Sequence, residues 1–343
     1  MSNNFVHLHT HSHYSLLDGM SKIPDLVKKA KDFGMPALAL TDHGVLYGAI
    51  EFYNECKKAE IKPIIGVEAY IAERSYLDKE SSLDTKRYHL TLLAKNNAGY
   101  KNLMKLVSIS HLDGYYYKPR MDLDLIEKHS QGLICLSGCP GSRFIQHLKS
   151  GNKEEATLLI KRYIKIFGKE NVFVEIMYHE DVNWYIPLIP QIIDVAKEVD
   201  LPIVATWDSH YLNEEDKEAH NTLLAINTNN QNFKFGGNYS FIGPEEAQKI
   251  FSSIPQATEN TLKVAEMVDL EIELSPWKFP TYPIENGESY DSELRKKKEK
   301  GLTERSYDKT PEALERIEFE LEVIKNKGFS SYFLVVADLV KSA

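Results

Sequence analysis

The sequence predicts an α/β protein whose strands and helices alternate and close into a β/α barrel. Seven short apolar runs recur through the first two thirds of the chain, and most are separated by segments with helical spacing. Such alternation indicates a parallel sheet, either open or closed. Histidine, acidic and cysteine residues stand at or near the ends of six runs. An open sheet gathers functional residues only at a switch point, whereas a barrel collects them along its carboxyl rim, so a barrel is favoured.

The apolar runs predict seven strands. They begin at Phe5, Ala37, Lys62, His89, Gly132, Asn171 and Pro202. Helical spacing predicts helices over residues 21–34, 50–58, 154–167 and 188–199. In the first run, histidines alternate at positions 7, 9, 11 and 13. Because residues i and i+2 of an extended strand share a face, His9 and His11 can converge on one metal ion.

The last third of the chain has a different composition. Helices are expected over residues 213–226 and 257–268, and the three prolines within 275–287 indicate a linker. A charged helical stretch at 297–301 and an amphipathic helix at 311–325 follow. We therefore expect a first domain over 1–270, a linker over 271–300 and the start of another domain over 301–343. The apolar tail ends without a cap, so we expect the chain to be cut from a longer one.

Composition excludes some classes of protein. With 50 acidic and 41 basic residues, the net charge is −9, which argues against a protein that coats nucleic acid through bulk positive charge. Local binding of phosphates through metal ions is still compatible with this charge. The chain lacks a long apolar stretch or a secretory signal, and its three cysteines suit a reducing setting. We expect a cytoplasmic protein without a membrane partner.

Nine residues form the predicted metal site, and most of them stand at strand ends. They are His9, His11, Asp18, His43, Glu68, His89, Cys139, Asp208 and His210. One zinc ion takes about four ligands, so this set suits two or three ions. The mixture of nitrogen, oxygen and sulfur favours Zn, Mn or Fe over magnesium or calcium.

A charge count indicates what such a site would attract. Three carboxylates and an ionised thiolate give −4, and three divalent ions give +6, so the filled site would be net +2 and would attract a phosphate. Clustered ions also lower the pKa of bound water and clamp the oxygens of a phosphoester. The reaction implied is hydrolysis at phosphorus by a metal-held hydroxide.

Other residues receive supporting or structural interpretations. We expect His7 and Asp42 to orient ligands without binding metal themselves, and His13 to be exposed. Arg120 and Arg143 are candidates for phosphate-backbone contacts or for surface salt bridges. Residues away from strand ends are taken as structural or surface: His111, His147, His179, His220, Cys56 and Cys135.

Several motifs resemble the PHP (polymerase and histidinol phosphatase) family. They comprise residues 8–12, 41–44, 68, 89, 139 and 208–210. Further segments resemble the amino-terminal region of bacterial DNA polymerase III alpha subunits: residues 5–19, 62–70, 116–120, 136–139, 210–212 and 318–336. The resemblance covers essentially the whole chain. Trp207 stands where polymerase relatives usually carry Asn, and His7 stands where free-standing phosphatases often carry Asp.

The resemblance implies a distorted seven-stranded (β/α)7, TIM-like barrel with a trinuclear metal site, followed by the beginning of a polymerase palm region. The family's nine ligand positions fall on the nine residues named above, with Asp208, His210 and Glu68 as the catalytic group. An intact ligand set implies a metal-dependent 3′→5′ exonuclease that proofreads single-stranded DNA 3′ ends. The resemblance also implies contact with the remainder of the polymerase chain and with other replicase subunits. The polymerase active site would lie beyond residue 343.

Two alternatives remain open from the sequence. The domain could hold metal as a structural module of the polymerase without turnover. It could also be a free-standing small-molecule phosphatase, against which residues 116–120 and the tail helix argue. Comparing turnover of a DNA 3′ end with that of a small phosphate ester separates these functions.

Overall fold

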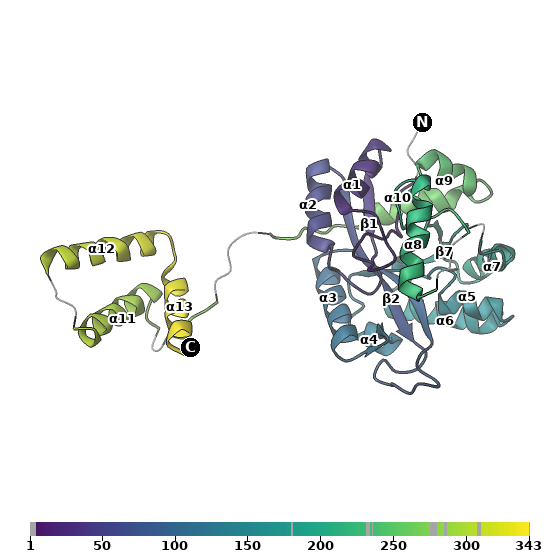
Figure 1. Ribbon diagram of the computed structural model, residues 1–343. Coiled ribbons are helices and arrows are strands. Elements are labelled where there is room, and N and C mark those ends of the chain that lie inside the picture. Colours follow the sequence, from purple (N-terminus) through teal and green to yellow (C-terminus); the bar gives the residue numbers. More distant parts are fainter. Residues whose placement is uncertain are drawn as a thin grey trace. The chain divides into compact units, whose positions relative to one another are not determined.

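The computed structural model describes residues 5–179, 181–230, 234, 236–274, 280–284, 287–306 and 310–342. The chain forms two compact units, Met1–Ile272 and Glu273–Ala343, and each is considered by itself (Figure 1). Of the prolines in the expected linker, Pro276 lies outside the described residues, whereas Pro280 lies within them. Among the described residues, no helix combines the length and apolarity needed to cross a bilayer.

Eight strands form one mixed sheet in the first unit. They are β1 (Ala37–Leu40), β2 (Lys62–Ala72), β3 (Arg87–Ala94), β4 (Tyr115–Tyr116), β5 (Lys118–Met121), β6 (Leu133–Leu136), β7 (Val172–Ile176) and β8 (Ile203–Ala205). The strand order is β4-β5-β2-β3-β6-β7-β8, and β1 also pairs with β2. Every residue of β1, β6 and β7 is buried, whereas the short strand β4 is partly exposed. The curled α/β sheet confirms the predicted fold class.

The sheet is not purely parallel, which corrects the sequence-based expectation. β3 runs antiparallel to both of its neighbours, β2 and β6. The reason lies in the connection: residues 73–86 between β2 and β3 contain no helix, and antiparallel neighbours need no helical crossover. Since β3 runs in reverse, its first residues lie at the same rim as the last residues of the parallel strands. His89 therefore reaches the carboxyl rim although it stands near the start of its strand.

The amino-terminal segment, residues 5–12, joins the two ends of this curled sheet. The backbone N–H of Ala39 donates to the carbonyl of His7 at 2.9 Å, and that of Thr41 donates to Thr10 at 2.9 Å. On the other side, the N–H of His11 donates to the carbonyl of Ser209, just beyond β8, at 2.8 Å. The segment pairs only through isolated bridges, not as a regular strand. It nevertheless lies where the first of the seven predicted strands is expected, between β1 and the end of β8.

Helices cover the sheet of the first unit. They are α1 (Ile23–Asp32), α2 (Ala49–Ala59), α3 (Asn97–Leu112), α4 (Leu123–Lys128), α5 (Arg143–Lys149), α6 (Lys153–Phe167), α7 (Ile189–Glu198), α8 (Lys217–Thr228), α9 (Pro244–Ile250) and α10 (Pro255–Met267). In Figure 1, α1 to α3 flank one side of the sheet and α5 to α7 the other. Each packs an apolar stripe inward; on α1 the buried residues are Ile23, Leu26, Val27 and Ala30.

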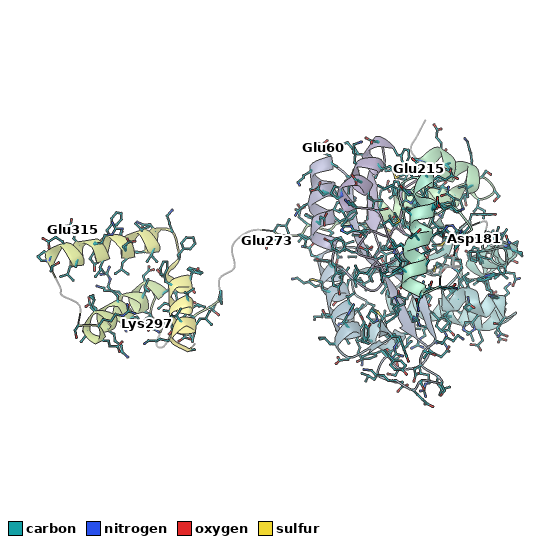
Figure 2. The ribbon with its side chains drawn as sticks, in the orientation of Figure 1. Glu60, Asp181, Glu215, Glu273, Lys297 and Glu315 are labelled. Carbon is teal, nitrogen blue, oxygen red and sulfur yellow. The ribbon has the colours of Figure 1, made fainter. Side chains whose placement is uncertain are left out.

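The second unit contains α11 (Tyr290–Glu304), α12 (Pro311–Asn326) and α13 (Ser330–Ser342). α12 agrees with the helix predicted over 311–325, and α11 begins inside the stretch expected to be a linker. Among the described residues of this unit, only Ser330 and Leu334 are buried. Charged side chains cover both units, such as Glu60 and Glu215 on the first and Glu315 on the second (Figure 2).

Candidate metal centre

The nine predicted ligands converge at the carboxyl rim of the sheet in the first unit. The amino-terminal segment contributes His9 and His11, and the turn that follows it contributes Asp18. The remaining residues lie on or directly after strands: His43 after β1, Glu68 on β2, His89 on β3, Cys139 after β6, and Asp208 and His210 after β8. These segments are held in register by parallel bridges, including Thr10 with Ser209 and His43 with Glu68.

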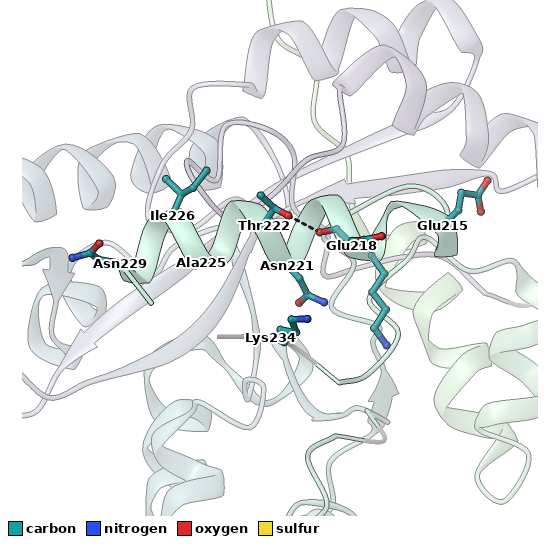
Figure 3. Close-up of a pocket in the computed structure, with 9 residues that line it drawn as sticks. Glu215, Glu218, Asn221, Thr222, Ala225, Ile226, Asn229 and Lys234 are labelled. Atoms are coloured by element: carbon teal, nitrogen blue, oxygen red, sulfur yellow. Dashed lines mark hydrogen bonds between the residues drawn. The ribbon is translucent and has the colours of Figure 1, made fainter. Parts of the chain in front are cut away.

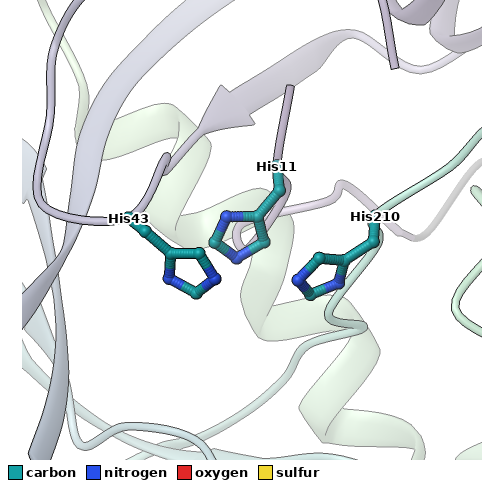
Figure 4. Close-up of side chains that lie close together, drawn as sticks. All are labelled: His11, His43 and His210. Carbon is teal, nitrogen blue, oxygen red and sulfur yellow. The ribbon is translucent and has the colours of Figure 1, made fainter. Parts of the chain in front are cut away.

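This set contains three groups of residues, and within each group the ligand atoms all lie within 4.8 Å of one another. The groups are His11, His43 and His210; His9, His11 and Asp208; and Glu68, His89 and Cys139. Figure 4 shows the first group, in which the His11 ring lies between those of His43 and His210, with ring centres 4.1 and 4.4 Å away. Asp18 adjoins this group, with Oδ2 at 2.8 Å from His43 Nε2 and Oδ1 at 3.6 Å from His210 Nε2.

Glu68 is the hub of the cluster and is fully buried. One of its carboxylate oxygens lies 2.7 Å from His89 Nδ1, and the other lies 2.7 Å from His43 Nδ1. His9 and His11 each approach the same carboxylate through Nε2 at 3.4 Å. Burial alone would raise the pKa of Glu68, but the charges of the surrounding imidazoles lower it well below its ordinary value. The carboxylate is therefore ionised and can bridge more than one cation.

His9 is held from behind by Glu175. Its Nδ1 lies 3.0 Å from Glu175 Oε1 and donates to this carboxylate oxygen. Glu175 is itself fixed by Thr206 Oγ1 at 2.6 Å and by the N–H of Gly138 at 2.9 Å. The tautomer leaves His9 Nε2 with a lone pair, 3.7 Å from Asp208 Oδ1. A carboxylate that fixes the far nitrogen of an imidazole is a common arrangement at metal sites.

His11 is held in the same way by Ser15. The Ser15 hydroxyl donates its one proton to Asp42 at 2.8 Å, so at 2.9 Å it accepts from His11 Nδ1. Asp42 also accepts from the N–H and hydroxyl of Ser12, at 2.7 and 2.9 Å. His11 Nε2 is consequently unprotonated and points at Asp208 Oδ1, 3.1 Å away. Burial lowers the pKa of His11 to about 3, and the nearby imidazoles of His43 and His210 add to this effect.

His43 and His89 are held differently. Both nitrogens of His43 lie 2.7–2.8 Å from candidate ligands, Glu68 and Asp18. His89 Nδ1 contacts Glu68 and lies 3.4 Å from Cys139 Sγ, and its side chain is 27% exposed. Burial would lower the pKa of His43, but the charges of Glu68 and Asp18 raise it well above its ordinary value. In the absence of a cation, protons compensate these carboxylates.

The remaining candidate ligands have strongly perturbed pKa values. Burial opposes the charge of Asp208, but His210, His9 and His11 together lower its pKa well below the usual range. The carboxylates of Asp208 and Asp18 outweigh burial at His210 and raise its pKa to about 9. Burial, reinforced by Glu68 and Asp208, raises the pKa of the Cys139 thiol well above its ordinary value. A bound cation would be needed to ionise this thiol.

The donor set fits a metal. Buried atoms with lone pairs face one another without hydrogen-bond partners among the described residues, notably His9 Nε2, His11 Nε2 and Asp208 Oδ1. Buried polar atoms left unpaired are costly, and a cation between them would satisfy all three at once. Imidazole nitrogen, carboxylate oxygen and thiolate sulfur match the preferences of Zn, Mn and Fe.

Some functional residues escaped the sequence interpretation. Glu175 and Ser15 orient ligands, yet each stands alone in its segment; the only signal was a carboxylate within the apolar strand β7. His179 lines the cleft beside Cys139 and Asp208. His220, on α8, is buried with Nε2 at 3.7 Å from Asp18 Oδ1. Both had been interpreted as structural or surface residues; His220 lies on a helix, away from strand ends, but His179 stands three residues after β7, so its position was misjudged.

Two supporting or binding roles expected from the sequence are not seen. His7 Nε2 lies 3.0 Å from the carbonyl of Ile242, and its ring stacks on Phe241, so it packs below the cluster rather than orienting a ligand. Arg120 is fully buried and donates to four backbone carbonyls. Its guanidinium is therefore not available to a phosphate. Arg143 is partly exposed and lies 3.3 Å from Glu73.

A separate groove runs along the outer face of α8, beside Asn221, Thr222 and Ile226 (Figure 3). None of the nine candidate ligands lines it. A second cleft is lined by six of the candidate ligands and by Tyr239. These ligands are Asp18, His43, His89, Cys139, Asp208 and His210.

Comparisons with known proteins agree with this arrangement. Residues 7–179 match the PHP domain family, and residues 292–343 match the bacterial DNA polymerase III alpha NTPase domain. The DNA polymerase III subunit alpha of Borreliella burgdorferi is 42% identical over 349 residues, covering 99% of this chain and 30% of that protein. The corresponding subunit of Aquifex aeolicus is 36% identical over 375 residues, covering 100% of this chain and 32% of that protein.

Among solved structures, a two-domain protein from Bacteroides vulgatus with a predicted PHP-like metal-dependent phosphoesterase is similar to this chain. The identity is 15% and the TM-score 0.36, covering 76% of this chain and 68% of that chain. The chain spans about 30% of the length of the curated relative from Borreliella burgdorferi.

Proposed function

We propose, from the premise that this chain belongs to the PHP domain family, that its nine-residue cluster holds two or three divalent transition-metal ions and hydrolyses phosphodiester bonds. The observation that carries the proposal is that His9, His11 and Asp208 have buried polar atoms without hydrogen-bond partners and ligand atoms within 4.8 Å of one another. In a protein without such ions, only protons shared with neighbouring side chains would offset the cost of burying these atoms.

The cluster's own residues perform distinct tasks in this proposal. His9, His11 and Glu68 form the buried floor, and Asp208 and His210 stand in the wall of the cleft, where they can reach a substrate. Divalent ions bound here would polarise the phosphoryl group and lower the pKa of water. His210 lies between two carboxylates, with Nδ1 3.5 Å from Asp208 Oδ1 and Nε2 3.6 Å from Asp18 Oδ1, so it can serve as a ligand in the wall of the cleft.

The substrate we propose is the 3′ end of single-stranded DNA, degraded in the 3′→5′ direction as in proofreading. This finer assignment rests on the similarity of the chain to DNA polymerase III alpha subunits. We further propose that it acts in the cytoplasm, with the remainder of a polymerase chain and other replicase subunits as partners. No residue of the described cluster suggests polymerisation.

The test combines metal analysis with a nuclease assay on the purified chain. We expect stoichiometric metal and Mn²⁺-dependent release of nucleotides from a primer 3′ end, both lost in Asp208→Asn and His9→Ala. Nucleotide release that persists in both variants would contradict the proposal. Bound metal without release from any phosphodiester would instead support a structural module, and preferential turnover of a small phosphate monoester would support a phosphatase.

A further inference from the structure

A small basic and aromatic surface adjoins the outer edge of the metal centre. It consists of Tyr70, Arg87 and Lys118, and we call it the Tyr70 surface. The Tyr70 ring lies 6.0 Å from the ring of His43 and 5.3 Å from that of His89. The guanidinium of Arg87 and the ammonium of Lys118 lie 5.9 and 5.6 Å from the Tyr70 ring centre. Two cations thus flank a ring that touches two candidate ligands.

The alternation of β3 explains why one of these cations stands next to the cluster. Residues 87, 89 and 91 share one face of the strand. Thr91 lies deepest, with its hydroxyl oxygen 3.4 Å from His9 Nδ1. His89 is the next residue outward on this face, with Nδ1 2.7 Å from Glu68 Oε1. Arg87 is the next residue on this face, roughly 6.8 Å further out along the strand. It is exposed at the mouth of the site.

The charges of Arg87 and Lys118 are not neutralised by the protein. Among the described residues, neither side chain forms an ion pair with a carboxylate, and Arg87 donates only to the carbonyl of Thr85 at 3.0 Å. The neighbouring cations differ in this respect: Lys86 and Arg143 both pair with Glu73 at 3.3 Å. In a chain of net charge −9, two uncompensated cations beside the cluster favour an anion.

We propose that the Tyr70 surface binds the backbone phosphate of single-stranded nucleic acid next to the bond that is cleaved. This inference rests on the proposed function and extends it by assigning the residues that bind the strand. Arg87 and Lys118 donate to the phosphate oxygens, and the buried ring of Tyr70 lies against both cations and holds them beside the cluster. A substrate with only one phosphodiester would not reach this surface.

The first test compares two substrates in the full chain. One is a single-stranded oligonucleotide, and the other is the p-nitrophenyl ester of thymidine 5′-phosphate, which carries a single phosphodiester. We expect Arg87→Ala and Lys118→Ala each to raise KM for the oligonucleotide about tenfold, since a hydrogen bond to a charged group is lost. Turnover of the small ester should change less than about twofold by the same reasoning. Arg87→Lys, which keeps the charge, should recover part of the loss.

A binding measurement provides a second readout that does not depend on turnover. Fluorescence anisotropy of a labelled single strand gives the binding constant K at several salt concentrations. For each cation removed, the slope of log K against log salt should become shallower by about 0.7. Lys105→Ala, an exposed lysine on α3, should leave affinity and slope unchanged. Arg143→Ala should have a smaller effect than Arg87→Ala, because Glu73 already compensates Arg143.

The outcomes separate this inference from the proposed function. Equal losses of activity on the oligonucleotide and on the small ester would overturn the inference. Such losses would show that Arg87 and Lys118 stabilise the metal centre and do not bind the strand. Unchanged oligonucleotide KM and salt slope would also overturn it. If the wild-type chain cleaves neither substrate, the proposed function fails, whereas the anisotropy series still decides whether the surface binds a strand.

Discussion

Four of the five imidazoles of the metal centre fall into two sets that are held in opposite ways. On the inner side, His9 and His11 each have Nδ1 fixed by Glu175 or Ser15, so that Nε2 faces the cluster. On the outer side, His43 and His89 make their side-chain contacts with other candidate ligands. The inner side is therefore oriented before any ion binds, whereas the outer side depends on its partners within the cluster. Preorganised ligands bind more tightly because less ordering is required.

The largest effect on metal binding is expected from removing an inner ligand. His9→Ala should lower metal affinity by more than the roughly 100-fold upper limit known for loss of an orienting partner. His89→Ala should lower it less, because this half-buried ring is not fixed from behind. Equilibrium dialysis against a chelator, followed by metal analysis, measures both. Equal losses in the two variants would remove the distinction between the two sides.

The next effect concerns the residue that orients His9. Glu175→Gln should lower metal affinity about 10–100-fold, because one amide group cannot accept from His9, Thr206 and Gly138 as a carboxylate does. The matched control is Glu154→Gln, an exposed glutamate at the start of α6. If circular dichroism shows both variants folded and their metal affinities are equal, the orienting role of Glu175 is wrong.

A smaller effect is expected at Ser15. Ser15→Ala removes the acceptor for His11 Nδ1 and one donor to Asp42, and we expect about a tenfold loss of metal affinity, the lower end of the range for orienting partners. Ser15→Thr restores the hydroxyl and should recover most of the affinity. A failure of the threonine variant to recover affinity while it remains folded would argue against the hydrogen bond as the cause.

The smallest effect on metal binding is expected at Arg120, which lies away from both sides. Arg120→Met leaves buried carbonyls of Gly114, Asp84, Tyr76 and Asp78 without their donor. We expect unfolding in urea to show a loss of about 2–4 kcal/mol. Metal affinity of the folded variant should be unchanged. A large loss of affinity would show that the loop over residues 73–86 positions the outer side.

The sequence was sufficient to predict the general position of the cluster, because strand ends in an alternating α/β chain meet at one rim. The direction of β3 was predicted wrongly, although residues 73–86 lack the helical spacing that a crossover between parallel neighbours would need. Yet this reversal is what brings His89 to the rim. The error in strand direction therefore left the placement of His89 intact.

Supporting contacts were harder to predict than ligands. Glu175 and Ser15 act through hydrogen bonds to residues 166 and 4 positions away, and no spacing rule marks such partners. Arg120 was expected at a surface because arginine is usually exposed, but the carbonyls of the loop over residues 73–86 bury it. Which polar groups satisfy one another depends on tertiary packing, and packing is not visible in a single sequence.

Anomalous X-ray diffraction from crystals of the chain grown with Mn²⁺ or Zn²⁺ tests the central claim most directly. That claim is that the nine residues form one metal centre with an inner side oriented in advance. The account predicts anomalous peaks within the cluster, contacted by His9 and His11 through Nε2 while Nδ1 stays bonded to Glu175 and Ser15. Peaks only outside the cluster, or contact through Nδ1 of these two histidines, would contradict it.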